Sequence, residues 1–395
     1  MIYLDYNATT PLCVPAREAM LPYLERHYGN ASSIHAAGRE ARAAIDDARD
    51  ALAALTGAKP HELIFTGSGT EANNLAVLGL ARANAERGRH LITASTEHHA
   101  VLHPFQQLQR NEQFEVTFLP VDSGGRIDPD ELAREIRPQT TLVSIMTANN
   151  ETGVVQPLRK ISEVCRARGV LLHSDMIQSF GKLPTELRTG LRTGLVDAAS
   201  FAAHKFYGPK GAGFLYLRAG LPIQPILFGG AHENDRRPGT ENVAAIAGMA
   251  AAAEWTLSDL DTEQARQASL RDQLWMAISD AWPSAQQNVD LAHRLTNTLN
   301  VSFAGVSSET MLMALDLEGI GASSGSACMV GSVMASHVLL AMGCEPDVAG
   351  SAIRFSLGKQ TTPAEIAAAA DAIRRVLQRL AHSAELVGGR SYAAV

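Results

Sequence analysis

The chain has 395 residues, of which 46% are hydrophobic and 19% are charged. This length exceeds what one hydrophobic core usually supports, and the composition excludes a disordered chain, so we expect a large globular domain with a smaller one. The 34 Lys and Arg against 41 Asp and Glu give a net charge of −7 without any basic tract, which disfavours direct binding to nucleic acid.

The N-terminal residues show no cationic segment followed by an apolar run, and no later stretch is apolar over the roughly 18 residues that a membrane helix needs. We therefore expect a soluble, cytoplasmic protein without a membrane partner. The 4 cysteines, Cys13, Cys165, Cys328 and Cys344, have neither Cys-x-x-Cys nor dense spacing, which disfavours a disulfide framework or a structural zinc site. A thiol with a chemical role stays open.

Helical and strand patterns alternate along most of the chain. Residues 38–55 are rich in Ala with Arg and Asp and precede Gly57, which predicts a helix that ends at a glycine. Short apolar runs then recur between helix-like segments, at residues 63–65, 90–93, 116–119, 141–146, 170–173 and 213–217. Such strands predict an α/β fold with a mostly parallel sheet that helices cover on both faces.

The pattern changes towards the C-terminus. An Ala-rich helix is predicted at residues 243–255, and a longer helix with a polar face at residues 262–279. We expect a large domain at residues 15–255 and a smaller α+β domain formed by residues 1–14 together with 256–395.

A candidate anion site follows the first of the helix-linked strands. Residues 66–71 read TGSGTE and open a helix whose inner face would be formed by Ala72, Leu75, Ala76 and Gly79. Backbone N–H groups at such a helix start bind phosphate or another anion. The spacing fits neither the dinucleotide motif nor a Walker loop. An ordinary strand-to-helix turn is the alternative.

Titratable side chains follow two later strands. His98 and His99 come after one strand, and His99 lies four residues from His103, a spacing that suits a metal. Without a third ligand, we favour an imidazole stacked on a planar ligand or a plain loop histidine. Asp175 lies at the carboxyl end of another strand, where open α/β sheets bind ligands. Its carboxylate could pair with a protonated pyridine nitrogen or cap the next helix.

Two further residues are candidates for covalent chemistry. Residues 200–211, SFAAHKFYGPKG, place Lys205 between two predicted strands, and in a dry pocket with cationic neighbours its amine could form a Schiff base. A solvated lysine is the alternative. Residues 323–328, SSGSAC, place Cys328 among small polar residues, which favours an accessible loop. A reactive thiol and a buried one both stay open.

In this order, the motifs resemble those of the pyridoxal-phosphate-dependent cysteine desulfurases of the class V aminotransferase family, in the group with an extended catalytic loop. The resemblance runs from YLDYNATTP at residues 3–11 to IRFSLG at residues 353–358. Between them lie NNETG at 149–153, Asp175 with Gln178, HKFYGPKG at 204–211 and RPGT at 237–240. It implies a fold-type-I α/β fold and a homodimer.

The resemblance implies roles for the residues around the cofactor ring. Lys205 would hold pyridoxal phosphate as a Schiff base and move the substrate Cα proton. Asp175 would keep the pyridine nitrogen protonated, so that the ring acts as an electron sink. His98 would stack on the ring face and help proton transfer, and Gln178 and Asn150 would reach the ring oxygen.

The same resemblance implies a phosphate site, a substrate clamp and a sulfur carrier. The phosphate would be held by Gly69, Thr70, His204 and Thr240 of the partner subunit. Arg354 with Asn150 would bind the substrate carboxylate. The Cys328 thiolate would attack the sulfur of L-cysteine, become a persulfide and release L-alanine. No resident metal is implied, although Cys328 could transiently ligate an iron–sulfur cluster.

The implied acceptor of the sulfur is another protein, an iron–sulfur scaffold or a tRNA-thiolation protein. Two alternatives remain: a selenocysteine lyase or cysteine-sulfinate desulfinase with the same cofactor, and a catalytically silent scaffold of the same fold. The presence of Lys205, Asp175, His98 and Cys328 together argues against the silent scaffold, because a scaffold has no physical need for all of them.

Three departures from the family pattern bear on the site. Ala202 stands where a serine usually meets the phosphate, so cofactor affinity is expected to be lower. Met176 and Ile177 replace small residues, which is expected to alter packing against the ring. Met334 and Ala335 replace a usual Glu-Pro in the catalytic loop, which suggests an atypical acceptor.

Overall fold

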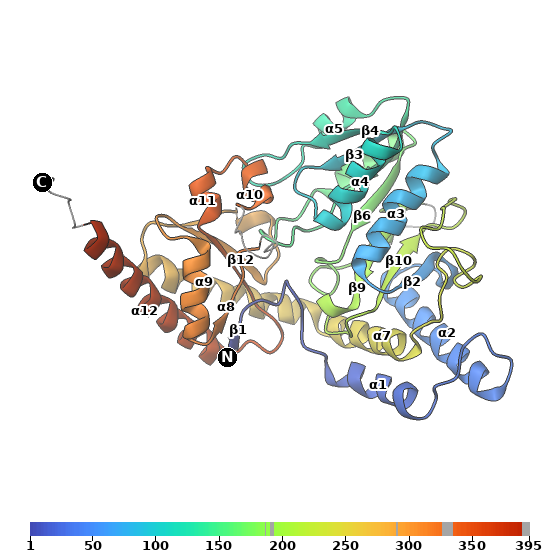
Figure 1. Cartoon of the computed structure of the whole chain (residues 1–395), viewed down its shortest axis with the longest axis horizontal. Coiled ribbons are helices and arrows are strands. Elements are labelled where there is room, and N and C mark those ends of the chain that lie inside the picture. Colours follow the sequence, from blue (N-terminus) through green and yellow to red (C-terminus); the bar gives the residue numbers. More distant parts are fainter. Residues whose placement is uncertain (186, 190–192, 290, 326–334, 389–395) are drawn as a thin grey trace, which may run out of the picture.

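A seven-stranded sheet organises the larger part of the chain (Figure 1). Its strands lie in the order β2 (Leu63–Thr66), β10 (Gly213–Leu217), β9 (Ala198–Ala202), β6 (Leu171–Asp175), β5 (Thr140–Ser144), β3 (His90–Ala94) and β4 (Glu115–Leu119). The computed structural model describes residues 1–185, 187–189, 193–289, 291–325 and 335–388. In this sheet β10 runs antiparallel to both of its neighbours, whereas the other pairs are parallel. The predicted mostly parallel α/β fold is confirmed.

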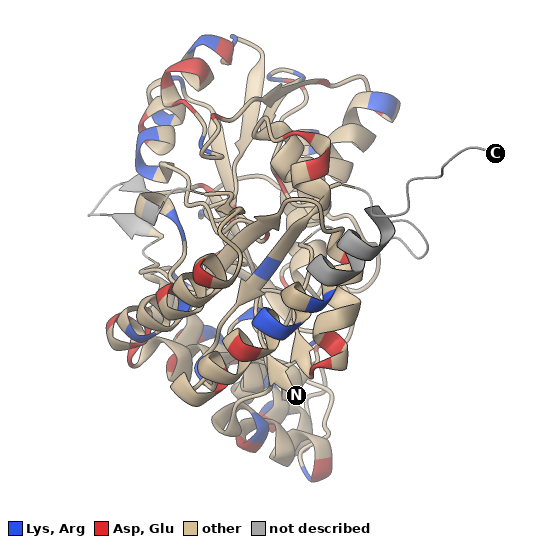
Figure 2. Ribbon diagram, turned by 90° about the vertical axis from the view of Figure 1, so that its left-hand side faces the viewer, with Lys and Arg blue, Asp and Glu red and all other residues tan. Residues whose placement is uncertain are grey.

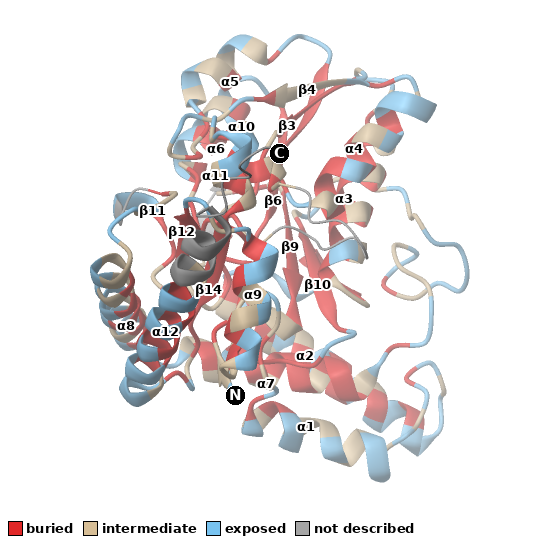
Figure 3. Ribbon diagram, turned by 60° about the vertical axis from the view of Figure 1, so that its left-hand side comes forward, coloured by how far each residue is buried: buried red, intermediate tan, exposed pale blue. Residues whose placement is uncertain are grey.

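Helices cover both faces of this sheet because neighbouring strand residues point to opposite sides. Leu91 and Leu142 belong to a core cluster with helices α3 (Gly69–Ala83) and α4 (His99–Asn111). Their neighbours Ile92 and Val143 belong to the opposite cluster. That cluster includes side chains of α1 (Val14–Glu25), α2 (Ala36–Thr56), α5 (Pro129–Glu135), α6 (Leu158–Ala167) and α7 (Val243–Leu257). Figure 3 shows the strands as a buried layer between helices with exposed outer faces.

The predicted helix at residues 38–55 is confirmed as α2. Its buried residues Ala41, Ile45, Ala48 and Leu52 recur every three or four positions and form one apolar stripe. Gly57 follows the helix with φ of +69°, a left-handed conformation that glycine adopts without a steric penalty.

The smaller part of the chain is built on the antiparallel sheet of β11 (Ala285–Gln287), β12 (Thr298–Phe303) and β14 (Ala352–Ser356). Helices α8 (Leu260–Ala281), α9 (Ser308–Leu317) and α12 (Pro363–Gly388) contribute to its core. The N-terminal strand β1 (Ile2–Tyr3) pairs with β13 (Ile320–Gly321), and Leu4 belongs to the same core. The N-terminal segment therefore packs with the C-terminal part of the chain, and the boundaries at residues 15 and 255 stay predictions.

Short elements complete the chain. They are α10 (His337–Ala341), α11 (Pro346–Gly350), the hairpin of β7 (Arg188–Thr189) and β8 (Thr193–Gly194), and the 3-10 turns Pro60–Glu62, Ala203–Lys205 and Leu291–His293. Figure 2 shows Lys and Arg interspersed with Asp and Glu along the helices of one side. No helix in the described part of the chain is long and apolar enough to cross a membrane.

Candidate active site

A cavity of about 410 Å³ lies at the carboxyl ends of the parallel strands. The connections after β2, β3, β5, β6 and β9 all contribute to its wall, together with the N-terminal segment and residues around β14. Of the residues predicted for the site, the cavity is lined by Gly69, Thr70, His98, Asn150, Asp175, Gln178, His204, Lys205 and Arg354. Thr240, which was predicted to act in the partner subunit, is exposed and does not line it. Cys328 lies outside the described residues.

The start of α3 forms one end of the cavity. Ser68 caps the helix by accepting a hydrogen bond from Glu71 N at 3.1 Å. A Cβ atom on Gly69 would lie 2.3 Å from Ile177 Cδ1 and 3.0 Å from Ala202 Cβ, so only glycine fits without displacing the wall. The first backbone N–H groups of the helix are therefore closely approachable, as an anion site requires.

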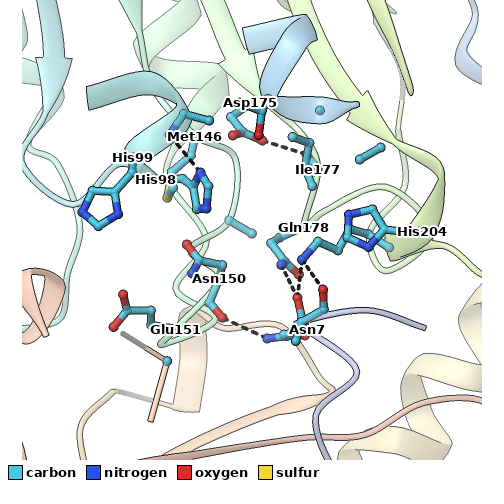
Figure 4. A pocket seen from close by; sticks show the side chains of 18 of the residues that line it. Asn7, His98, His99, Met146, Asn150, Glu151, Asp175, Ile177, Gln178 and His204 are labelled. Carbon is cyan, nitrogen blue, oxygen red and sulfur yellow. Dashed lines mark hydrogen bonds between the residues drawn. The ribbon is translucent and has the colours of Figure 1, made fainter. Parts of the chain in front are cut away.

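Asp175 ends β6 as a buried carboxylate. Its Oδ1 accepts from Ile177 N at 2.9 Å (Figure 4), and its Oδ2 accepts from Asn73 Nδ2 at 2.6 Å. Burial raises the pKa of Asp175, while these hydrogen bonds and the charge of Lys205 act in the opposite direction. No ion pair to Asp175 is present among the described residues. A buried carboxylate of this kind is stabilised by a cationic ligand group.

Lys205 closes the 3-10 turn that follows β9. Its Nζ donates to the carbonyl oxygens of Asn7 at 2.6 Å and Ala8 at 2.8 Å. Burial lowers the pKa of this amine from 10.5 to about 8, and the charge of Arg354 lowers it further. The amine is therefore available as a nucleophile and base much closer to neutral pH than an ordinary lysine.

Two imidazoles that line the cavity, those of His98 and His204, are uncharged at neutral pH. His98 caps α4, because its Nδ1 accepts from Ala100 N at 3.0 Å, and its ring faces the cavity (Figure 4). Burial and the charge of Lys205 lower the pKa of His98 to about 4. The pKa of His204 is lowered to about 4 for the same reasons. A neutral ring can stack on a planar ligand without charge repulsion.

His99 stacks against two other imidazoles rather than sharing a ligand with them. Its ring centroid lies 4.9 Å from that of His103 and 4.9 Å from that of His337. Within the described ranges, no group of three or more His, Cys, Asp or Glu is placed to hold a metal ion. The spacing of His99 and His103 therefore reflects a ring stack at the edge of the cavity.

Arg354 reaches the cavity from β14. Its Nη1 donates to Asn150 O at 2.8 Å and its Nη2 to Asp5 Oδ1 at 2.6 Å. Its Nε is buried and has no hydrogen-bond partner within the described part of the chain. A guanidinium oriented in this way keeps further N–H groups for a ligand carboxylate.

Sequence reasoning missed the central position of Asn7. Its carbonyl oxygen accepts from Lys205 Nζ and, at 2.8 Å, from Gln178 Nε2. Its side-chain Nδ2 donates to Thr298 Oγ1 at 2.9 Å, which ties the N-terminal segment to β12. Asn7 belongs to the N-terminal motif, but the sequence alone gave no reason to place it beside the lysine.

Described residues on both sides of Cys328 lie close to Glu151, which lines the cavity. Ser336 Oγ donates to Glu151 Oε2 at 2.5 Å, and Gly325 lies close to the same side chain. Burial raises the pKa of the Glu151 carboxyl. Ser323 and His337 also line the cavity, so both described ends of the segment that carries Cys328 reach its rim.

The residues that depart from the family pattern lie in different places, some in the cavity wall and one in the hydrophobic core. Ile177 and Ala202 line the cavity, whereas Met176 is 4% exposed and packs in the hydrophobic core. Only Ile177 of that pair therefore alters the wall. Ala335 is described, and Met334 lies outside the described residues.

Comparisons with known proteins agree with this geometry. The sequence matches the aminotransferase class-V family over residues 2–368. A protein named cysteine desulfurase IscS from Dictyoglomus turgidum is 44% identical over 380 residues, which cover 96% of this chain and 95% of that protein. A solved NifS-like protein superposes with a TM-score of 0.89 at 36% identity and covers 95% of this chain and 99% of its own. SspA in complex with cysteine superposes with a TM-score of 0.79 at 34% identity, over 90% of this chain and 98% of its own.

Proposed function

The chain belongs to the class-V aminotransferase family and is a cysteine desulfurase, and we propose that it uses pyridoxal phosphate, Lys205 and Cys328 to convert L-cysteine to L-alanine. The observation that carries the proposal is the meeting of Lys205, Asp175 and the start of α3 in one cavity. Each offers the chemistry that a different group of the cofactor needs.

The cavity fits pyridoxal phosphate at three points. The buried Asp175 carboxylate makes no ion pair among the described residues and suits a protonated pyridine nitrogen. The start of α3 at Gly69 suits the phosphate, and the low-pKa amine of Lys205 suits the aldehyde. When bound, the cofactor supplies a cationic conjugated ring that withdraws electrons from the substrate carbon.

The side chains of this protein then bind the substrate and move its protons. Arg354, which lines the cavity, binds the carboxylate of L-cysteine through its guanidinium. Lys205 Nζ accepts the Cα proton, which requires the uncharged amine that burial favours. From the cavity wall, the neutral imidazole of His98 would stack on the cofactor ring, and Gln178 and Asn150 would bind the ring oxygen.

Sulfur leaves the substrate through Cys328. The thiol of Cys328 and L-cysteine give a Cys328 persulfide and L-alanine, so that sulfur, protons and electrons balance. The described residues on both sides of Cys328 reach the cavity rim, which supports this role. We propose that the persulfide passes to a sulfur-acceptor protein in the cytoplasm, and that a homodimer brings Thr240 of the partner subunit to the phosphate.

A test of the proposal joins spectroscopy with peptide mapping. The purified protein is expected to bind pyridoxal phosphate, absorb visible light and carry the cofactor on Lys205 after borohydride reduction. The Lys205→Ala variant should show no covalent cofactor. A wild-type protein that stays colourless when supplied with pyridoxal phosphate would contradict the proposal.

A further inference from the structure

A second lysine lies behind the wall of the cavity. Lys182 follows β6, and its Nζ donates to Gln178 Oε1 at 2.7 Å and to Asn7 Oδ1 at 3.3 Å. Burial and the charges of Lys205 and Arg354 hold the pKa of Lys182 well below its usual range. No carboxylate pairs with Lys182 within the described part of the chain. Lys182 is half-buried, and both contacts of its amine with amide oxygens call for an explanation because lysines mostly lie in solvent.

The contact with Lys182 fixes the orientation of the Gln178 amide. A glutamine amide has one accepting oxygen and an NH₂ group with two donor hydrogens, and rotation by half a turn exchanges them. Lys182 occupies the oxygen, so the NH₂ group points the other way. One of its hydrogens goes to Asn7 O at 2.8 Å (Figure 4). The other is left for the cavity that Gln178 lines.

We propose that Lys182 is a positioning residue, which holds Gln178 as a hydrogen-bond donor towards an oxygen of the bound cofactor. Lys182 does not itself line that cavity. It acts through Gln178, and also through Asn7, whose side-chain oxygen it shares with Asn297 Nδ2 at 3.0 Å. This inference rests on the proposed function, because the cofactor is the ligand that Gln178 would meet.

Lys359 shows what a buried lysine with a structural role looks like in the same region. Lys182 and Lys359 line one small cavity. Lys359, however, pairs with the Asp259 carboxylate and lies 4.4 Å from the centre of the Trp255 ring. Among the described residues, Lys359 makes no hydrogen bond to Gln178. The Lys359→Met variant is therefore a matched control for Lys182→Met.

A double-mutant cycle tests the proposal. Pyridoxal phosphate affinity is measured for the wild type, Lys182→Met, Gln178→Ala and the double variant, together with the visible absorbance maximum of the bound cofactor. Lys182→Met is expected to weaken binding about tenfold, the effect of losing about 1.4 kcal/mol of binding free energy. In the Gln178→Ala background the same substitution should change affinity less than twofold, because the residue through which Lys182 acts is gone. Lys182→Met should also shift the absorbance maximum in the same direction as Gln178→Ala, and Lys359→Met should shift neither quantity.

The outcomes are distinguishable. Equal losses of affinity from Lys182→Met in both backgrounds, or an absorbance maximum unchanged by Lys182→Met, would overturn the positioning role while leaving the proposed function intact. A wild-type protein without affinity for pyridoxal phosphate would overturn both. If Lys182→Met fails to fold, Gln178→Glu replaces it, since the carboxylate keeps the contact with Lys182 but cannot donate to the cavity when ionised. Its affinity is expected to fall as far as that of Gln178→Ala, and wild-type affinity would overturn the proposal.

Discussion

The phosphate end of the cavity offers a gain-of-affinity prediction at Ala202. This residue is the last of β9, is 2% exposed and lines the cavity. Its Cβ is 3.0 Å from where a Cβ on Gly69 would lie, so it faces the start of α3. The Ala202→Ser substitution would place a hydroxyl donor beside the proposed phosphate site.

The size of the gain follows from the charge of the phosphate. A hydrogen bond to a charged group contributes about 1.5–3 kcal/mol. This free energy corresponds to about 10- to 150-fold in the dissociation constant. Because Ile177 also occupies this corner, as its close approach to Gly69 shows, we expect a gain towards the lower end of that range.

Cofactor loss measures the effect directly. Holoenzyme of the wild type and of Ala202→Ser is dialysed against a carbonyl scavenger, and the decay of visible absorbance is followed. Ala148→Ser is the matched control, since Ala148 is a buried alanine in the cavity wall after a different strand, β5. Equal rates of loss from wild type and Ala202→Ser would refute the reasoning, because they would mean that another donor or water already serves the phosphate.

Three further predictions concern individual titratable groups. The rate at which cofactor-free protein takes up pyridoxal phosphate should rise with pH through about 8 and then level off. The reason is that the uncharged amine of Lys205 is the reacting form and predominates above its lowered pKa. A rate that still rises towards pH 10.5 would contradict this prediction. Asp175→Asn should slow exchange of the substrate Cα proton with deuterated water about 100-fold, as expected from removing one partner of a buried charge pair, and NMR showing wild-type exchange would exclude the role of Asp175. Iodoacetamide at neutral pH should label Cys328 before Cys13, Cys165 and Cys344, because burial raises the pKa of these three thiols, that of Cys165 to about 12. Peptide mapping that finds any of the three labelled first would count against a reactive Cys328.

The elements that local sequence determines were predictable. The helix ending at Gly57 needs only an apolar stripe and a glycine that tolerates a positive φ. The strand β9 was missed because Ala198–Ala202 has little strand propensity of its own and is held by pairing with β6 and β10. The antiparallel direction of β10 depends on its connection to β9. No α-helix lies between β9 and β10 in the described chain, so the connection is too short for a parallel crossover.

The residues of the candidate site also fall into those that local sequence predicts and those that it does not. Gly69, Asp175 and Lys205 each stand at the end of a strand in a recognisable motif, and the sheet brings them to one edge. Asn7 could not be placed beside Lys182 and Lys205, because these contacts join segments far apart in the sequence. Their positions follow from the pairing of β1 with β13 and from the turn after β6, neither of which has a local signal.

The central claim is that sulfur leaves L-cysteine through Cys328, and a single-turnover experiment tests it most directly. Holoenzyme is mixed with one equivalent of L-cysteine, trapped with an alkylating agent, digested and analysed by mass spectrometry while alanine is quantified. We predict one additional sulfur atom on the peptide that contains Cys328, in amounts equal to the alanine formed, and almost no alanine or sulfide from the Cys328→Ser variant. Alanine and sulfide released by that variant at the wild-type rate would contradict the account.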